Sequence, residues 1–325
     1  MSKILVTGAN GFVGQALCRL LIARGHAVTA LVRTPGGCVD GVVEWVDTSE
    51  DYARVADTWP ATLRPDCIVH LAARVHVMRD NAVGPDAAFH RTNVDGTLRV
   101  ARAALQHGVS RFVFASSIKA VADTDHGHPL NEQDTPQPQD AYGRSKLAAE
   151  RSLWQLHATT GLDVTIVRPP LVYGPHVRAN FLRMLDAVHR GLPLPLGAVT
   201  AQRSMVYIDN LADALSHCAI DPRAANQCFH VADDHSPTVS ELLTAVGAAL
   251  GRPARLIPVP AAWLRTLALI AGKTKQIDRL TGNLRVDTAH LRRQLDWRAP
   301  IAFADGLRET ARWYSGRWQQ PVPSR

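Results

Sequence analysis

Short apolar runs alternate with helix-length amphipathic segments over the first 170 residues. Within those segments apolar residues recur every three or four positions, which is the period of a helix with one buried face. Strands that alternate with helices predict βαβ units, and uninterrupted apolar runs are typical of parallel strands covered on both faces. The predicted strands are Lys3–Val6, Ala27–Val32, Cys67–Leu71, Arg111–Ala115 and Val164–Val167, and the predicted helices are Phe12–Arg24, Asn93–His107 and Tyr142–Thr160.

The pattern changes after Arg168, where five prolines within 27 residues interrupt it. Two later apolar runs, near 205–208 and 228–231, are predicted to complete the same sheet, and helices are predicted at Ser240–Leu250 and Ala261–Ala271. We therefore expect an α/β fold, with a doubly wound and mostly parallel sheet and a smaller C-terminal α+β lobe that begins near residue 170.

Composition excludes several classes of protein. The 325 residues are 46% hydrophobic and carry a net charge of +7, but the 36 cations are scattered, so we expect no nucleic-acid binding. Five widely spaced cysteines without a Cys-x-x-Cys pair predict neither a disulfide framework nor a metal site. We also expect a cytoplasmic protein without signal peptide or membrane segment, since no apolar stretch reaches the ~20 residues that span a bilayer.

A glycine-rich turn follows the first predicted strand. Residues 8–14 read Gly-Ala-Asn-Gly-Phe-Val-Gly and lead directly into a predicted helix. The first glycine permits a tight turn, the second lets a pyrophosphate approach the backbone, and the third allows close packing of helix on strand. The helix N-terminus supplies free N–H groups, so this context favours a dinucleotide-binding loop over a purely structural turn.

A tyrosine and a lysine begin a later predicted helix. Tyr142 and Lys146 are four residues apart and share one helix face. A phenol has a pKa near ~10, and a neighbouring ammonium is expected to lower it toward the range useful for acid–base catalysis. Ser116 and Ser117 follow a predicted strand at the sheet edge where open α/β sheets bind ligands, although serines there also act as turn formers.

These motifs resemble the extended short-chain dehydrogenase/reductase family, the NAD-dependent epimerases and dehydratases. Further matching segments occur in order along nearly the whole chain: His70-Leu-Ala-Ala73, Thr92-Asn-Val-Asp-Gly-Thr97, Arg168-Pro-Pro-Leu-Val-Tyr-Gly-Pro175 and Arg203-Ser-Met-Val-Tyr-Ile-Asp-Asn210. The resemblance implies a dinucleotide-binding Rossmann domain at 1–169, a nucleotide-sugar lobe formed mainly by 170–325, and a homodimer built from two helices of each subunit.

The resemblance also implies roles for individual residues. Ser117, Tyr142 and Lys146 are expected to catalyse hydride and proton transfer at sugar C4. Substrate contacts are expected from Asn180, Arg203 and Arg279. Cofactor contacts are expected from Gly8, Asn10, Gly11, Phe12, Val13, Gly14, Arg33, Asp47, Leu71, Ala72, Ala73, Asn93, Ser116, Tyr142, Lys146 and Pro169.

The second predicted strand ends without the acidic residue that usually binds the adenosine ribose. Arg33 follows Val32 directly, and an arginine there favours a ribose 2′-phosphate. We therefore expect NADP(H) to be preferred, with NAD(H) possible if Arg33 points into solvent or stacks on adenine. Asp47, after another apolar run, is assigned by the resemblance to the adenine edge.

The residues after the second serine also differ from those of part of the family, and this difference argues against one class of reaction. The 4,6-dehydratases of the family place Asp-Glu after the catalytic serine or threonine, whereas this chain has Ile118-Lys119. The sequence resembles more closely the 4-ketoreductases of bacterial surface-polysaccharide pathways, which reduce UDP-4-keto-6-deoxy-N-acetylglucosamine. A UDP-sugar 4-epimerase with retained NAD is the alternative, and a non-catalytic dinucleotide sensor is a minor one.

Overall fold

A seven-stranded parallel sheet forms the centre of the protein in a computed structural model that describes residues 1–75, 85–270 and 274–319. Its strands follow the order β3-β2-β1-β4-β5-β6-β9, so the chain winds first to one side of β1 and then to the other. This reversal between β1 and β4 is the switch point at which such sheets bind ligands. The strands are β1 (Lys3–Thr7), β2 (Ala27–Val32), β3 (Val43–Val46), β4 (Cys67–His70), β5 (Arg111–Ala115), β6 (Asp163–Arg168) and β9 (Cys228–His230).

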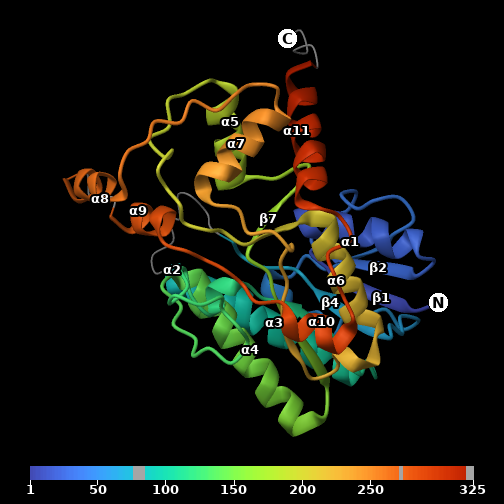
Figure 1. Cartoon of the computed structure of the whole chain (residues 1–325). Helices are drawn as coiled ribbons and strands as arrows, with labels where there is room; N and C mark the ends of the chain where they lie inside the picture. The colour runs from blue at the N-terminus through green and yellow to red at the C-terminus, as the bar shows by residue number, and fades with distance from the viewer. Residues whose placement is uncertain (76–84, 271–273, 320–325) are drawn as a thin grey trace.

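Helices cover both faces of this sheet (Figure 1). Helices α1 (Phe12–Ala23) and α6 (Ile208–Ile220) pack against each other, and one buried apolar cluster joins them to the strands. Helices α3 (Gly96–Gln106) and α4 (Ala141–Thr160) contribute to a second cluster with β4, β5 and β6. The α/β class and the parallel sheet expected from the alternating pattern are therefore confirmed.

One predicted strand lies elsewhere. The run near 205–208 forms β8 (Met205–Tyr207), which pairs with β7 (Leu171–Tyr173) in a separate two-stranded parallel sheet. The expectation that it completes the main sheet is wrong, whereas β9 does pair with β6. Apolar strand residues are buried in either sheet, so their composition does not identify their pairing partner.

Most of the remaining helices belong to the C-terminal lobe, whereas α2 and the π-helical turn that follows it pack against α4. In Figure 1, α5, α7 and α11 lie together beyond one end of the sheet, while α8 and α9 project to the side. No helix in the described residues is long and apolar enough to cross a membrane. The bounds are α2 (Pro85–His90), a π-helical turn (Arg91–Asp95), α5 (Ala179–His189), α7 (Val239–Ala249), α8 (Ala261–Ile270, with Ala271 outside the described residues), α9 (Thr274–Thr281), α10 (Ala289–Leu295) and α11 (Phe303–Gln319).

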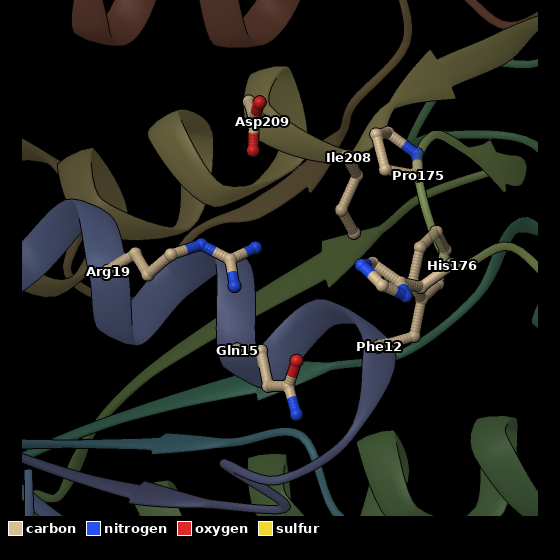
Figure 2. A pocket seen from close by; sticks show the side chains of 7 residues that line it. All are labelled: Phe12, Gln15, Arg19, Pro175, His176, Ile208 and Asp209. Carbon is tan, nitrogen blue, oxygen red and sulfur yellow. The ribbon is translucent and has the colours of Figure 1, made fainter. Parts of the chain in front are cut away.

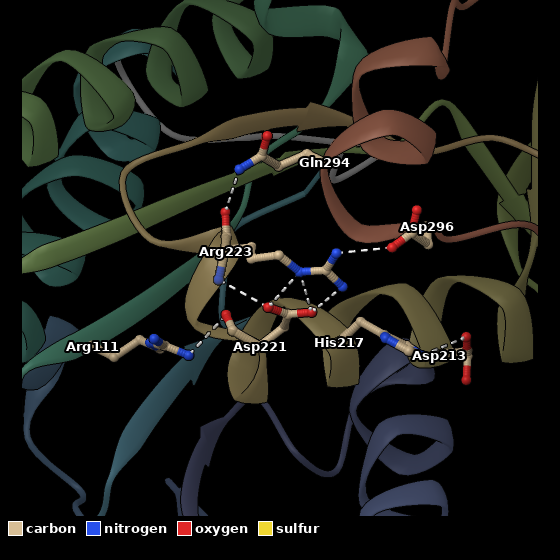
Figure 3. A network of polar contacts seen from close by, with 7 residues as sticks. All are labelled: Arg111, Asp213, His217, Asp221, Arg223, Gln294 and Asp296. Atoms are coloured by element: carbon tan, nitrogen blue, oxygen red, sulfur yellow. Dashed lines mark hydrogen bonds and ion pairs between the residues drawn. The ribbon is translucent and has the colours of Figure 1, made fainter.

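A polar network fastens the amino-terminal edge of the sheet (Figure 3). Arg111, the first residue of β5, donates to the Asp221 carbonyl oxygen at 3.1 Å. Arg223 pairs with the carboxylates of Asp221 and Asp296, each at 2.8 Å, and thereby links the end of α6 to the chain after α10. Because parallel strands share one direction, this network lies at the edge opposite the candidate site.

Candidate active site

The glycine loop holds three backbone segments in close contact. Gly8 has φ +66°, and a Cβ there would lie 2.9 Å from the backbone nitrogen of Ala72. A Cβ at Gly14 would lie 2.2 Å from the Gly8 carbonyl oxygen, so α1 can approach the end of β1 this closely only because residue 14 lacks a side chain. Gly11 donates its N–H to the Gly8 carbonyl oxygen at 2.9 Å. Helix α1 then begins at Phe12 with no side-chain cap, which leaves its first N–H groups available to an anion.

Asp47 lies at the carboxyl end of β3 and is buried. Its Oδ1 accepts a hydrogen bond from the Ser49 N–H at 2.9 Å. Its Oδ2 is buried without a hydrogen-bond partner among the described residues. A buried oxygen of this kind is costly unless a donor reaches it, and the amino group of an adenine is a suitable donor. The glycine loop and Asp47 therefore fit the pyrophosphate and adenine of a dinucleotide.

Other residues expected to contact the cofactor lie at the same sheet edge. Ala72 donates its N–H to Thr7 Oγ1 at 3.2 Å in the loop after β4, which also contains Leu71 and Ala73. The Arg33 and Asn10 side chains are exposed. Pro169 follows β6, and its carbonyl oxygen accepts from the Ile118 N–H at 2.9 Å, which supports the turn that carries Ser117.

Asn93 is buried and its polar atoms bind the protein itself. Its Oδ1 accepts from the Arg74 N–H at 2.7 Å, and its Nδ2 donates to the Arg74 carbonyl oxygen at 3.0 Å and to Ser145 Oγ at 2.9 Å. These bonds tie the loop after β4 to helix α4. Asn93 therefore helps to position α4; its two Nδ2 hydrogens are used within the protein, whereas Oδ1 can still accept a second hydrogen bond.

Helix α4, which carries Tyr142 and Lys146, begins against the turn that carries Ser117. Asp140 caps α4 by accepting the Gly143 N–H at 2.8 Å. A Cβ at Gly143 would lie 2.3 Å from the Lys119 carbonyl oxygen, so only glycine allows α4 to pack so closely on the turn after β5. This packing joins the Ser117 hydroxyl and the Tyr142 phenol by a hydrogen bond. The sequence placed these two groups together, and the structure does so as well.

Burial dominates the electrostatics of the pair Tyr142 and Lys146. It raises the pKa of Tyr142 to about 12, with the Ser117 hydrogen bond acting in the opposite direction. It lowers the pKa of Lys146 to about 7, which the nearby Glu150 carboxylate opposes. Lys146 Nζ donates to the Ala115 carbonyl oxygen at 2.7 Å and lies 6.0 Å from the centre of the Tyr142 ring. The expected lowering of the Tyr142 pKa by Lys146 is therefore wrong for the chain alone.

Ser116, which the sequence placed beside the cofactor, forms a hydrogen bond within the protein. Its hydroxyl donates to the Glu150 carboxylate, which also accepts from Arg168 Nε at 3.0 Å, so Ser116 belongs to a buried polar group beside helix α4. Sequence reasoning did not single out Glu150. Its signal was the spacing of four residues after Lys146, which places both on one helix face.

The two arginines expected to contact substrate come together near the turn that carries Ser117. Arg279 on α9 pairs with Asp123 at 2.6 Å and lies 3.6 Å from Asp140. Arg203 is half-buried, and burial lowers its pKa while Asp123 and Asp125 raise it. Lys119, which follows the serine turn, also pairs with Asp140. Sequence reasoning did not identify Asp123 or Asp140, although an aspartate two residues before Tyr142 is a typical helix cap.

Two further expected contact residues are Asn180 and Phe12. Asn180 is exposed in the first turn of α5. The Phe12 side chain, from α1, lines a small cavity of about 60 Å³ with Pro175 and His176 (Figure 2). Phe12 therefore offers a phosphate only its backbone N–H. Arg19 and Asp209 face each other across the same cavity.

Comparisons with known proteins identify the family and the fold of this chain. The NAD dependent epimerase/dehydratase family matches residues 4–232. A UDP-glucose 4-epimerase of Vibrio cholerae is 37% identical over 312 residues, covering 95% of this chain and 94% of its own. Among solved structures, the UDP-glucose 4-epimerase of Thermotoga maritima with UDP-glucose aligns with a TM-score of 0.78 at 22% identity, covering 97% and 99%. The UDP-glucose 4-epimerase of Thermus thermophilus in complex with NAD aligns with a TM-score of 0.76 at 25% identity, again covering 97% and 99%.

Proposed function

Because the chain belongs to the NAD dependent epimerase/dehydratase family, we propose that it is a UDP-sugar 4-epimerase that uses NAD. The observation that carries the proposal is the hydrogen-bonded pair Ser117 and Tyr142, with Lys146 on the same helix face, at the sheet edge that also holds the glycine loop. The Vibrio cholerae relative is a UDP-glucose 4-epimerase, which supports this function better than the 4-ketoreductase expected from the sequence.

The chain's residues have separate tasks in this reaction. Tyr142, acting as the phenolate, takes the proton of the sugar 4-hydroxyl and later, as the phenol, returns it to the same oxygen, while the Ser117 hydroxyl orients that oxygen by hydrogen bonding. Bound NAD would supply the acceptor and donor of hydride at sugar C4. Lys146 adds positive charge near the phenol whenever it is protonated, and Glu150 favours that state.

Binding is divided between the two parts of the chain. The N-terminus of α1 and Asp47 would hold the pyrophosphate and adenine of the cofactor. Arg203 and Arg279 would bind the diphosphate of the nucleotide sugar, with Arg279 exchanging its ion pair with Asp123 for a phosphate oxygen. We thus assign cofactor binding mainly to residues 1–169 and substrate binding mainly to 170–325.

A dehydratase activity finds no support at the serine turn. The positions that carry an acid pair in dehydratases hold Ile118, which is buried, and Lys119, whose ammonium pairs with Asp123 and Asp140. No carboxylic acid at these two positions can protonate a leaving hydroxyl. Epimerisation needs only the proton carrier already described.

The proposal predicts the effect of removing the Tyr142 hydroxyl. In Tyr142→Phe, conversion of UDP-glucose to UDP-galactose, or of UDP-N-acetylglucosamine to its 4-epimer, should fall at least 10²–10⁴-fold, because a positioned proton carrier contributes about that much. Nucleotide-sugar products are separated by anion-exchange chromatography without added nicotinamide. Tyr314→Phe is the matched control, since that hydroxyl bonds Asp186 in the lobe and its removal should leave turnover nearly unchanged.

The same assay distinguishes the reductase. The protein is incubated with NADH or NADPH and UDP-4-keto-6-deoxy-N-acetylglucosamine, and nicotinamide oxidation is followed. Stoichiometric oxidation without 4-epimer formation from either UDP-sugar would replace the epimerase with the 4-ketoreductase. A Tyr142→Phe enzyme with near-normal turnover would remove Tyr142 from both reactions.

A further inference from the structure

Glu44, in β3, binds the loop that follows β2. Its Oε2 accepts the Gly36 N–H at 2.7 Å, and its Oε1 accepts the Cys38 N–H at 3.1 Å. The two hydrogen bonds hold the pKa of Glu44 below its usual value, with the Gly36 bond contributing most. Glu44 therefore brings a permanent negative charge to this loop at neutral pH.

The loop lies between the glycine loop and the end of β2. Gln15 of α1 donates from Nε2 to the Gly37 carbonyl oxygen at 3.3 Å. A Cβ at Gly37 would lie 3.1 Å from Asn10 Cβ, so the two loops are in close contact. In Rossmann folds the adenosine ribose lies between the phosphate loop and the end of the second strand. The loop that binds Glu44 thus borders the expected site of the ribose 2′-hydroxyl or 2′-phosphate.

The acidic residue that usually binds the ribose 2′-hydroxyl at the end of the second strand is absent from this chain. The second strand ends at Val32, which is buried and uncharged, and Arg33 beside it is exposed. Backbone N–H groups of such a loop are potential phosphate donors. In this chain the N–H groups of Gly36 and Cys38 already donate to the Glu44 carboxylate. A 2′-phosphate would therefore find these two donors occupied and would be repelled by the negative charge of Glu44.

We propose that Glu44 selects NAD(H) over NADP(H), replacing from the third strand the acidic residue absent from the end of the second. The inference rests on the dinucleotide site of the proposed function and concerns only its adenosine end. Arg33 would favour NADP(H) instead, so substitution of each residue should shift the preference in opposite directions.

The test measures nucleotide binding to the full chain, freed of bound nucleotide, by nicotinamide fluorescence with NADH and NADPH. The wild-type protein should bind NADH at least about tenfold more tightly, because a like charge beside the 2′-phosphate disfavours NADPH. Glu44→Gln should reduce the ratio about tenfold, mainly by tightening NADPH. Glu241→Gln is the matched control, because this carboxylate also accepts a loop N–H, that of Thr238 at 2.8 Å, and should leave the ratio unchanged.

Several outcomes would overturn the inference. An unchanged ratio in Glu44→Gln, including equal weakening of both nucleotides through a disturbed loop, would reject Glu44 as the selector. A wild-type preference for NADPH that Arg33→Ala removes would assign the selection to Arg33. Failure of the wild-type protein to bind either nucleotide would reject both the inference and the proposed function, whereas NADH preference without epimerase activity would reject the proposed function alone.

A nucleotide that stays bound through purification gives a second readout. Acid releases it, and mass spectrometry identifies it. The wild-type protein should release NAD, and Glu44→Gln should release NAD together with NADP. Release of NADP from the wild-type protein would contradict the proposal.

Discussion

Glu150, one helical turn after Lys146 in α4, forms a buried ion pair with Arg168 at the end of β6. The exposed fractions of their side chains are 2% and 8%, and Arg168 Nη2 lies 2.5 Å from Glu150 Oε2. Desolvation of two charges is costly, so a pair of this kind contributes little net stability compared with apolar residues. Removing one partner is different, because the other charge then remains buried without compensation. The pair thus positions Ser116 and helix α4. Substitution of either partner alone should strongly lower the free energy of unfolding.

We expect Glu150→Gln to lower the free energy of unfolding by about 3–5 kcal/mol, because Arg168 would keep its buried charge. Urea denaturation followed by circular dichroism measures the change. Changing Glu150 and Arg168 together to leucine should cost less than the single substitution. A single-variant loss below about 1 kcal/mol would show that water or another group compensates Arg168.

At the level of elements, α3 and α4 combine a buried face with residues that remain partly exposed. Leu153 of α4 is fully buried in its own subunit, and Leu147 is 8% exposed, so neither can contribute much to a dimer interface. Leu98, Leu105 and Leu156 are only half-buried against the same core. We propose that these three lie in a homodimer interface, in which α3 and α4 meet the same helices of a second copy.

Light scattering at micromolar concentration should therefore give about twice the 35.4 kDa of one chain. Leu98→Arg should give the monomer mass with the helical circular dichroism retained, because it places a charge in the interface. Leu269→Arg on α8, where the leucine is 71% exposed, is the control and should stay dimeric. A monomeric wild-type protein would contradict the proposal.

Across the whole molecule, two buried histidines link stability to pH. Burial lowers the pKa of His70 to about 3 and that of His230 to about 4. In the unfolded chain both titrate near ~6.5, so below this pH the unfolded state binds more protons than the folded state. Their contribution is complete above pH ~6.5 and is lost as the pH falls toward the folded values.

We expect the free energy of unfolding to decrease below pH ~6.5 by about 1.4 kcal/mol per pH unit for each histidine. Urea denaturation at pH 7, 6 and 5 measures this slope. His230→Asn should reduce the slope of the free energy of unfolding against pH by the contribution of one histidine. His128→Asn, at an exposed position, should leave this slope unchanged. Equal slopes in all three proteins would show that His230 titrates normally in the folded state.

Local patterns in the sequence were sufficient for much of the fold and for part of the site. The alternation of runs predicted the centres of the early strands and helices correctly, among them β1, β5, α1 and α4. The glycine loop and the spacing of Tyr142 and Lys146 led to the segments that we propose for cofactor binding and catalysis. These features depend on contacts within a few residues, where the sequence itself fixes the geometry.

Tertiary structure decided the partners of the remaining groups. Strand β8 joined β7 because pairing depends on which edge is free, which an apolar run does not encode. Ser116 binds Glu150 and Arg279 binds Asp123, across 34 and 156 residues of chain, because packing brings together groups whose spacing carries no signal. The same holds for Glu44, whose effect on the loop after β2 exists only because β3 lies beside β2 in parallel register. Burial, which no local pattern measures, set the pKa values of Tyr142 and Lys146.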